Sequence, residues 1–120
     1  MKSHNVIQDK SYAFALRIIK LYQFLVKKNE FLLSKQVLRC GTSIGANVEE
    51  AIGSQSEKEF ISKFSIVYKE ARETAYWLRL LKDSNLISEK QSASMLQDCD
   101  ELIRIIACIQ KTLKAKIRNA

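Results

Sequence analysis

Side chains that could carry out acid–base or nucleophilic chemistry are few in this chain of 120 residues. A hydrolytic triad needs a histidine base, and the chain has one histidine, His4, which we expect to be a solvated residue near the N-terminus. Glu70 and Glu73 share one face of a predicted helix, but Lys69 and Arg72 interleave with them. We therefore expect interhelical ion pairs and not an acid–base couple, which needs two converging carboxyls with separated pKa values. Because no nucleophile, base and orienting group can be assembled, we expect a non-enzymatic protein.

The cysteines and glycines do not form a metal or cofactor motif. The chain has an odd number of cysteines: Cys40, Cys99 and Cys108. Their spacing matches neither a disulfide framework nor a zinc site. The Glu-x-x-His pairs of di-iron helical bundles are missing from the sequence. Gly41 and Gly45 do not belong to a phosphate-binding loop pattern. We expect no metal and no cofactor, and we interpret the cysteines as small core residues of a reduced, cytoplasmic protein.

Apolar residues recur with helical spacing in four segments of a chain that has no proline and three glycines. Short connections between long helices force antiparallel neighbours, so we expect a single all-α domain over residues 1–120, folded as an up-down-up-down antiparallel four-helix bundle. No uncharged stretch approaches the roughly 20 residues needed to cross a membrane, so we expect no membrane partner. The predicted helices cover residues 5–28, 34–52, 57–83 and 88–117, with approximate ends.

Two glycines lie one turn apart inside the second predicted helix, at Gly41 and Gly45. Each costs a helix roughly 1 kcal/mol relative to alanine. Close approach of a neighbouring helix is the physical reason that would offset this cost.

Positive charge is concentrated at the two ends of the sequence. The chain has 20 Lys and Arg against 13 Asp and Glu, a formal net charge of +7. Residues 1–39 have eight basic and two acidic side chains, residues 40–103 have seven and eleven, and residues 104–120 have five and none.

The first and fourth helices of such a bundle are antiparallel neighbours, so their cations could form one phosphate-attracting surface. The candidate nucleic-acid-binding residues are Lys10, Arg17, Lys20, Arg104, Lys111, Lys114, Lys116 and Arg118. The alternative is a solubilising face whose cations suit the C-terminal dipole of the fourth helix.

The middle of the chain resembles a known family. The segment QVLRCGTSIGANVEEA at residues 36–51 is similar to the signature of the bacterial four-helix bundle proteins called 23S rRNA intervening-sequence proteins. The resemblance continues through Ser56, EFISK at residues 59–63, KEA at residues 69–71, Glu73 and YWLRLL at residues 76–81. It implies a cyclic homopentamer, and kinship with the accessory proteins of diversity-generating retroelements, which work with a reverse transcriptase and RNA.

The resemblance brings no catalytic residues, but it singles out recurring polar positions. We expect these side chains to form buried or interface polar pairs that fix the register of the helices. They are Ser43, Asn47, Glu50, Lys63, Lys69, Glu70 and Glu73.

Together these features predict a non-enzymatic helical-bundle protein that associates with RNA through a basic surface on its first and fourth helices. The broad apolar faces of the helices exceed what one bundle can bury, so we also expect a homo-oligomer; the number five comes from the resemblance alone. The alternative is a scaffold or accessory subunit that binds a protein partner, such as a reverse transcriptase, with no direct role in RNA binding.

Overall fold

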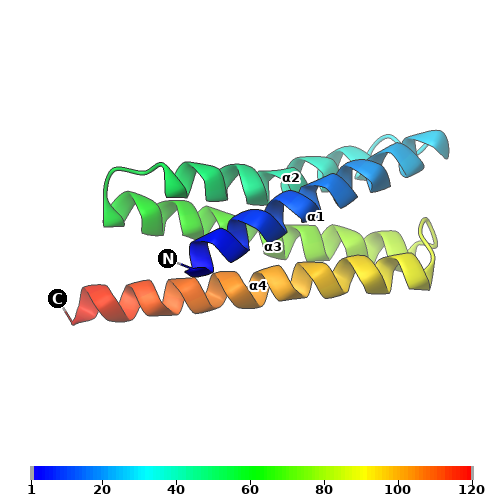
Figure 1. Cartoon of the computed structure of the whole chain (residues 1–120). Helices are drawn as coiled ribbons and strands as arrows, with labels where there is room; N and C mark the ends of the chain where they lie inside the picture. The colour runs from blue at the N-terminus through cyan, green and yellow to red at the C-terminus, as the bar shows by residue number, and fades with distance from the viewer. Residues whose placement is uncertain (1, 120) are drawn as a thin grey trace.

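The structure is a computed structural model that describes residues 2–119 and the side-chain surroundings of residues 6–119. It consists of four long helices, and no strand occurs within the described range; they are α1 (Lys2–Lys27), α2 (Leu33–Ile52), α3 (Glu57–Asp83) and α4 (Glu89–Arg118). Each helix runs opposite to the one before it (Figure 1), so the predicted up-down-up-down antiparallel bundle is confirmed. The side chain of His4 lies outside the described side chains, and its expected exposure stays a prediction.

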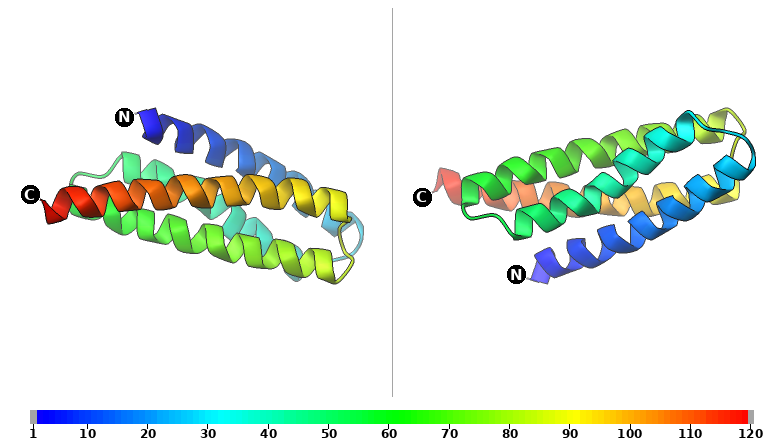
Figure 2. Two further views of the ribbon diagram at one scale, coloured as in Figure 1. Left: turned by 90° about the horizontal axis from the view of Figure 1, so that it is seen from below. Right: turned by 90° about the horizontal axis from the view of Figure 1, so that it is seen from above.

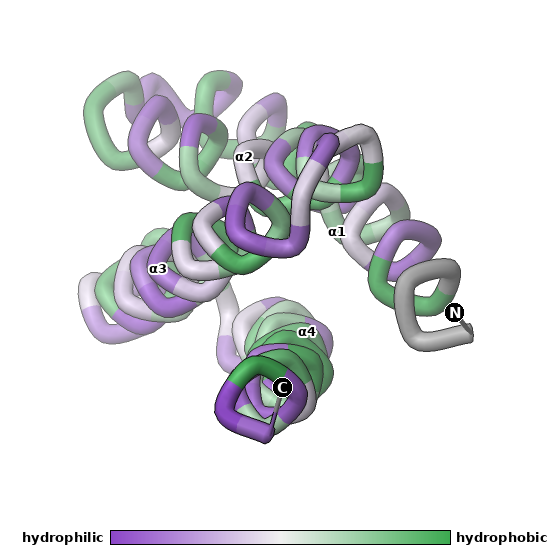
Figure 3. Tube along the Cα trace, turned by 90° about the vertical axis from the view of Figure 1, so that its left-hand side faces the viewer, coloured by the Kyte–Doolittle hydropathy of each residue, from purple (hydrophilic) through white to green (hydrophobic). Residues whose placement is uncertain are grey.

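The four helices form an elongated bundle of 52 × 22 × 20 Å in which one of the neighbouring pairs is less closely packed than the others. Contacts are extensive between α1 and α2, α2 and α3, and α3 and α4, and they are fewest between α1 and α4. The N-terminal part of α1 diverges from α4, and the C-terminal end of α4 extends past the start of α1 (Figures 1 and 2). Figure 3, which views the bundle along its length, shows hydrophilic positions on the outer side of α4. Because α4 extends past the start of α1, the basic residues at the end of α4 lie beyond α1.

The core is built from one apolar stripe on each helix, at the positions that the helical spacing predicts. Each stripe contains residues with no exposed surface; one example from each helix, in chain order, is Ile18, Ile44, Leu78 and Ile106. Burying side chains of this size gives roughly 1.5–3 kcal/mol each, which is the main source of stability for the bundle. Ser11 fills the gap in the stripe of α1, and its Oγ donates to the carbonyl oxygen of Gln8, 3.2 Å away.

Short polar motifs at the helix ends determine where the chain turns. The Ser88 hydroxyl accepts from the backbone N–H of Gln91, whose side-chain oxygen accepts from the N–H of Ser88, a complete capping box. At the start of α2, the Glu30 carboxylate accepts the backbone N–H groups of Leu33 and Ser34 (3.0 and 2.6 Å). Burial alone would raise the pKa of Glu30, but these backbone donors lower it below its ordinary value. Sequence reasoning placed Glu30 in a plain connection and missed this cap.

The two glycines of α2 face α1, and they differ in how closely it approaches. A Cβ built on Gly41 would lie 2.7 Å from the side chain of Ile18, which has no exposed surface. A Cβ on Gly45 would lie 3.4 Å from the backbone oxygen of Ser11, an ordinary contact distance. The close helix approach predicted from the sequence therefore requires a glycine at residue 41 but not at residue 45.

We expect the two alanine substitutions to change stability in opposite directions. Gly41→Ala gains helix propensity, about 1 kcal/mol, but overpacking a closed core costs about 1–3 kcal/mol, so the free energy of unfolding should fall. Gly45→Ala gains the same propensity without a clash and should raise the free energy of unfolding by up to about 1 kcal/mol. Urea unfolding followed by circular dichroism measures both changes. A stabilising Gly41→Ala would contradict the close packing of α1 on α2.

Candidate nucleic-acid interface

On the side of the bundle where α1 faces α4, two of the three predicted basic residues of α1 are paired with acids. The Lys10 ammonium lies 3.1 Å from a carboxylate oxygen of Glu101. The Arg17 guanidinium pairs with the carboxylate of Asp98 and donates to the Ser94 hydroxyl, 2.8 Å away. These ion pairs join α1 to α4, and they neutralise two of the cations that were expected to attract phosphate.

The basic residues at the end of α4 have a different environment. Lys116 pairs with Glu57 at the start of α3, with 2.7 Å between ammonium and carboxylate. The other four are exposed, and none of them has an ion pair among the residues that the structure describes. We call these four residues the α4 basic ridge: Arg104, Lys111, Lys114 and Arg118.

The α4 basic ridge runs along the outer part of its helix. Arg104, Lys111 and Arg118 are spaced by seven residues, which is close to two helical turns, so they recur along one line. With a rise of 1.5 Å per residue, the line is about 21 Å long. No acidic residue follows Glu101 in the sequence, so the second half of this helix carries only positive side-chain charge.

The eight candidate residues therefore belong to two helices and differ in their partners. Lys10, Arg17 and Lys20 belong to α1 and face the first half of α4, while the ridge lies on the second half. The end of α4 lies beside the start of α3, as the pair between Lys116 and Glu57 shows. The sequence placed this end beside the start of α1, and the structure corrects that placement because α4 extends past α1 (Figure 1).

The polar positions that the family resemblance singled out divide into pairs between helices and contacts within a helix. Glu50 on α2 pairs with Lys63 on α3, 2.7 Å apart, and this hydrogen bond raises the pKa of Lys63. Glu70 and Glu73 on α3 both pair with Arg39 on α2, which sequence reasoning did not include. These side chains are partly exposed, so each pair contributes at most about 1 kcal/mol and mainly fixes the register of α2 against α3.

The other three predicted polar residues make no hydrogen bond or ion pair between helices in the described part of the chain. Ser43 donates to the carbonyl oxygen of Arg39 (2.6 Å), and the Asn47 amide donates to that of Ser43 (2.8 Å), both within α2. Lys69 is exposed and has no ion pair with any described residue. The expected pairing network is therefore made by Glu50, Lys63, Glu70 and Glu73 together with Arg39.

Trp77 and Tyr76 are neighbours in sequence that occupy different environments. The Trp77 indole N–H donates to the Glu73 carboxylate, 2.9 Å away, and its ring packs against the core. Tyr76 meets the Trp77 ring edge-on and is 48% exposed. The exposed Tyr76 ring does not by itself make a base-stacking platform, which needs several aromatic side chains along a basic groove.

Two of the three cysteines are buried, and one is exposed. Burial raises the pKa of Cys40 to about 11 and that of Cys99 to about 12, so both are inert thiols at neutral pH. Cys108 is exposed on α4. Within residues 2–119, no three His, Cys, Asp or Glu side chains come together in a way that could hold a metal ion. No helix of that range is long and apolar enough to cross a membrane.

These features define a helical-bundle protein with an unpaired basic ridge. Residues 3–108 match the 23S rRNA-intervening sequence protein family, and the chain belongs to it. A crystal structure of a protein of unknown function from the S23 ribosomal protein family of Bacteroides thetaiotaomicron VPI-5482 has 48% sequence identity and a TM-score of 0.89. The alignment covers 91% of this chain and 98% of that chain. None of the functionally curated proteins compared with the chain matches it.

The family match ends before the last residues of the α4 basic ridge. Lys111, Lys114 and Arg118 lie beyond residue 108, where the matched segment stops. The positive charge at this end is therefore a feature of this chain that family membership alone does not imply.

Proposed function

We propose that this protein is a non-enzymatic, cytoplasmic homo-oligomer that binds structured RNA through the α4 basic ridge. The observation that carries the proposal is that none of these four cations forms an ion pair with a described residue. An exposed cation already paired with a carboxylate gains little from a phosphate, whereas an unpaired one can release counterions from RNA. Such binding depends on the density of phosphates and not on base sequence.

Self-association would increase the affinity of this surface. Three large apolar side chains on the outer face of α1 are exposed at helical spacing: Tyr12 by 66%, Leu16 by 49% and Ile19 by 39%. We call these three residues the α1 apolar stripe. A second copy of the chain is a suitable cover for such a stripe, because soluble proteins rarely leave contiguous apolar surface open to water. Every added copy would bring another α4 basic ridge, so that one RNA could contact several ridges at once.

A titration of the protein against a labelled structured RNA at several salt concentrations tests the proposal. We expect binding at low salt that weakens steeply as salt increases, because counterion release dominates the affinity. A shuffled RNA of the same length and fold should bind equally well. Absence of binding at low salt, or affinity that does not respond to salt, would contradict the proposal. Nuclease-resistant co-purification with a protein would instead favour a scaffold role.

A further inference from the structure

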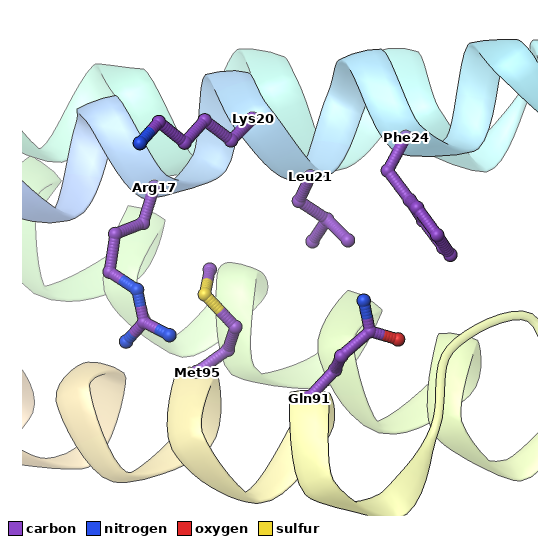
Figure 4. A pocket seen from close by; sticks show the side chains of 6 residues that line it. All are labelled: Arg17, Lys20, Leu21, Phe24, Gln91 and Met95. Atoms are coloured by element: carbon purple, nitrogen blue, oxygen red, sulfur yellow. The ribbon is translucent and has the colours of Figure 1, made fainter.

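A cavity of about 280 Å³ lies between α1 and α4, which are the least closely packed pair of neighbouring helices. It is lined by three apolar and three polar side chains, and we call it the α1–α4 pocket: Arg17, Lys20, Leu21, Phe24, Gln91 and Met95. Leu21 and Met95 are almost fully buried and belong to the core, so they form a fixed apolar wall. Figure 4 shows most of these side chains pointing from the two helices into the space between them, whereas Lys20 extends along α1.

The polar side chains of the pocket are distributed unevenly. Arg17 and Lys20 lie together at one end, and Phe24 lies at the other (Figure 4). Arg17 is held by Asp98 and Ser94, whereas Lys20 has no ion pair with any described residue. Because Arg17 is paired with Asp98, Lys20 carries the free positive charge at its end of the pocket. At the other end, the Lys28 ammonium lies over one face of the Phe24 ring, 4.4 Å from its centroid.

Gln91 presents a hydrogen-bond donor to the same space. Its side-chain oxygen accepts from the backbone N–H of Ser88, 3.1 Å away, as part of the capping box of α4. This contact fixes the amide, and Figure 4 shows its nitrogen directed toward the gap between Leu21 and Phe24. The side-chain nitrogen makes no hydrogen bond within the described part of the chain.

We propose that the α1–α4 pocket binds a nucleoside monophosphate unit, with the base between Phe24 and Met95 and the phosphate on Lys20. An aromatic ring and a thioether are favourable partners for the face and edge of a base. The Gln91 amide is placed to donate to a ring nitrogen or carbonyl of that base, and the unpaired Lys20 ammonium complements a phosphate. If the unit belongs to RNA, this inference rests on the function proposed above, and an unpaired nucleotide would enter the pocket. A free nucleotide carries the same chemistry.

Methionine methyl groups give a direct readout, because the chain has two methionines, Met1 and Met95. Protein labelled with 13C at the methionine methyl groups would be titrated with AMP, with inorganic phosphate and with a single-stranded oligoadenylate. We expect the Met95 signal to move upfield with AMP through the ring current of the base, while inorganic phosphate leaves it in place. A shift with the oligoadenylate as well identifies RNA as the source, and a shift with AMP alone identifies a free nucleotide.

Two glutamate variants separate a specific site from a general effect of charge. Gln91→Glu keeps an acceptor for the N–H of Ser88 and suits the start of a helix, so folding should be retained. It removes the amide donor and places negative charge in the pocket, and we expect AMP to bind at least about 10-fold more weakly. Gln97→Glu adds the same charge at an exposed position of α4 outside the pocket and should leave AMP binding unchanged.

The outcomes also separate this inference from the proposed function. If fluorescence anisotropy shows that RNA binds while neither AMP nor the oligoadenylate moves the Met95 signal, the pocket is not a nucleotide site and the RNA function stands. Equal weakening by Gln91→Glu and Gln97→Glu would also overturn the pocket. If RNA does not bind but AMP shifts Met95 and Gln91→Glu weakens it, the pocket stands as a site for free nucleotides and the RNA function fails.

Discussion

Replacing Arg104, Lys111 and Arg118 together by glutamine is expected to weaken binding of structured RNA by about 30-fold at low salt. Each exposed contact between a cation and a phosphate contributes on the order of 0.5–1 kcal/mol, so three contacts amount to about 2 kcal/mol. These residues form no ion pair with a described side chain, so their charge is available to phosphate. Fluorescence anisotropy with a labelled RNA hairpin measures the change.

A matched triple variant shows whether position or total charge matters. Three exposed lysines outside the α4 basic ridge serve as the control: Lys35, Lys58 and Lys90. None of them forms an ion pair with a described residue. Replacing them by glutamine removes the same net charge, and we expect it to weaken binding by less than about 3-fold. Equal weakening by both triple variants would mean that RNA responds to the overall charge of the protein and not to the ridge.

Leu16→Glu is expected to convert the oligomer to folded monomers at micromolar concentration. Leu16 lies at the centre of the α1 apolar stripe, and it is 49% exposed in the single chain, so the bundle should tolerate a glutamate there. Burying a leucine in an interface gives roughly 1.5–3 kcal/mol, and burying an unpaired carboxylate instead costs several kcal/mol. We therefore expect the dissociation constant for self-association to rise by at least about 100-fold. Light scattering coupled to size-exclusion chromatography measures the mass.

The control for this variant places a glutamate on another helix. Ala93 is exposed on α4, away from the stripe, and Ala93→Glu should leave the mass of the oligomer unchanged. A Leu16→Glu protein that keeps the wild-type mass would show that the α1 apolar stripe is not the interface. A wild-type protein that is already monomeric at micromolar concentration would contradict the oligomer itself.

The sequence predicts the fold of this protein well because each helix repeats a simple physical pattern. The stripe that contains Phe64, Val67, Ala71 and Leu78 is buried throughout, and Thr74 fills its missing position with a hydrogen bond to the Glu70 carbonyl. Such a pattern depends on spacing within one helix, so it can be read without the neighbouring helices.

The placement of the basic residues could not be predicted in the same way. Whether Lys10 faces solvent or Glu101 depends on the crossing of α1 and α4, which is a property of two helices far apart in sequence. The position of Lys116 beside Glu57 depends on the length by which α4 extends past α1. Sequence reasoning identified Glu70 and Glu73 but missed Arg39. Their pairing depends on how α2 packs against α3, which is also a property of two helices.

The salt dependence of RNA binding by the wild-type protein and by the triple variant of Arg104, Lys111 and Arg118 tests the central claim most directly. Each lost phosphate contact lowers the slope of log affinity against log salt concentration by roughly 0.7–0.9. We therefore predict that the slope of the triple variant is shallower than that of the wild type by about 2–3, while its unfolding midpoint stays close to that of the wild type. Identical slopes for the two proteins would show that RNA does not contact the α4 basic ridge.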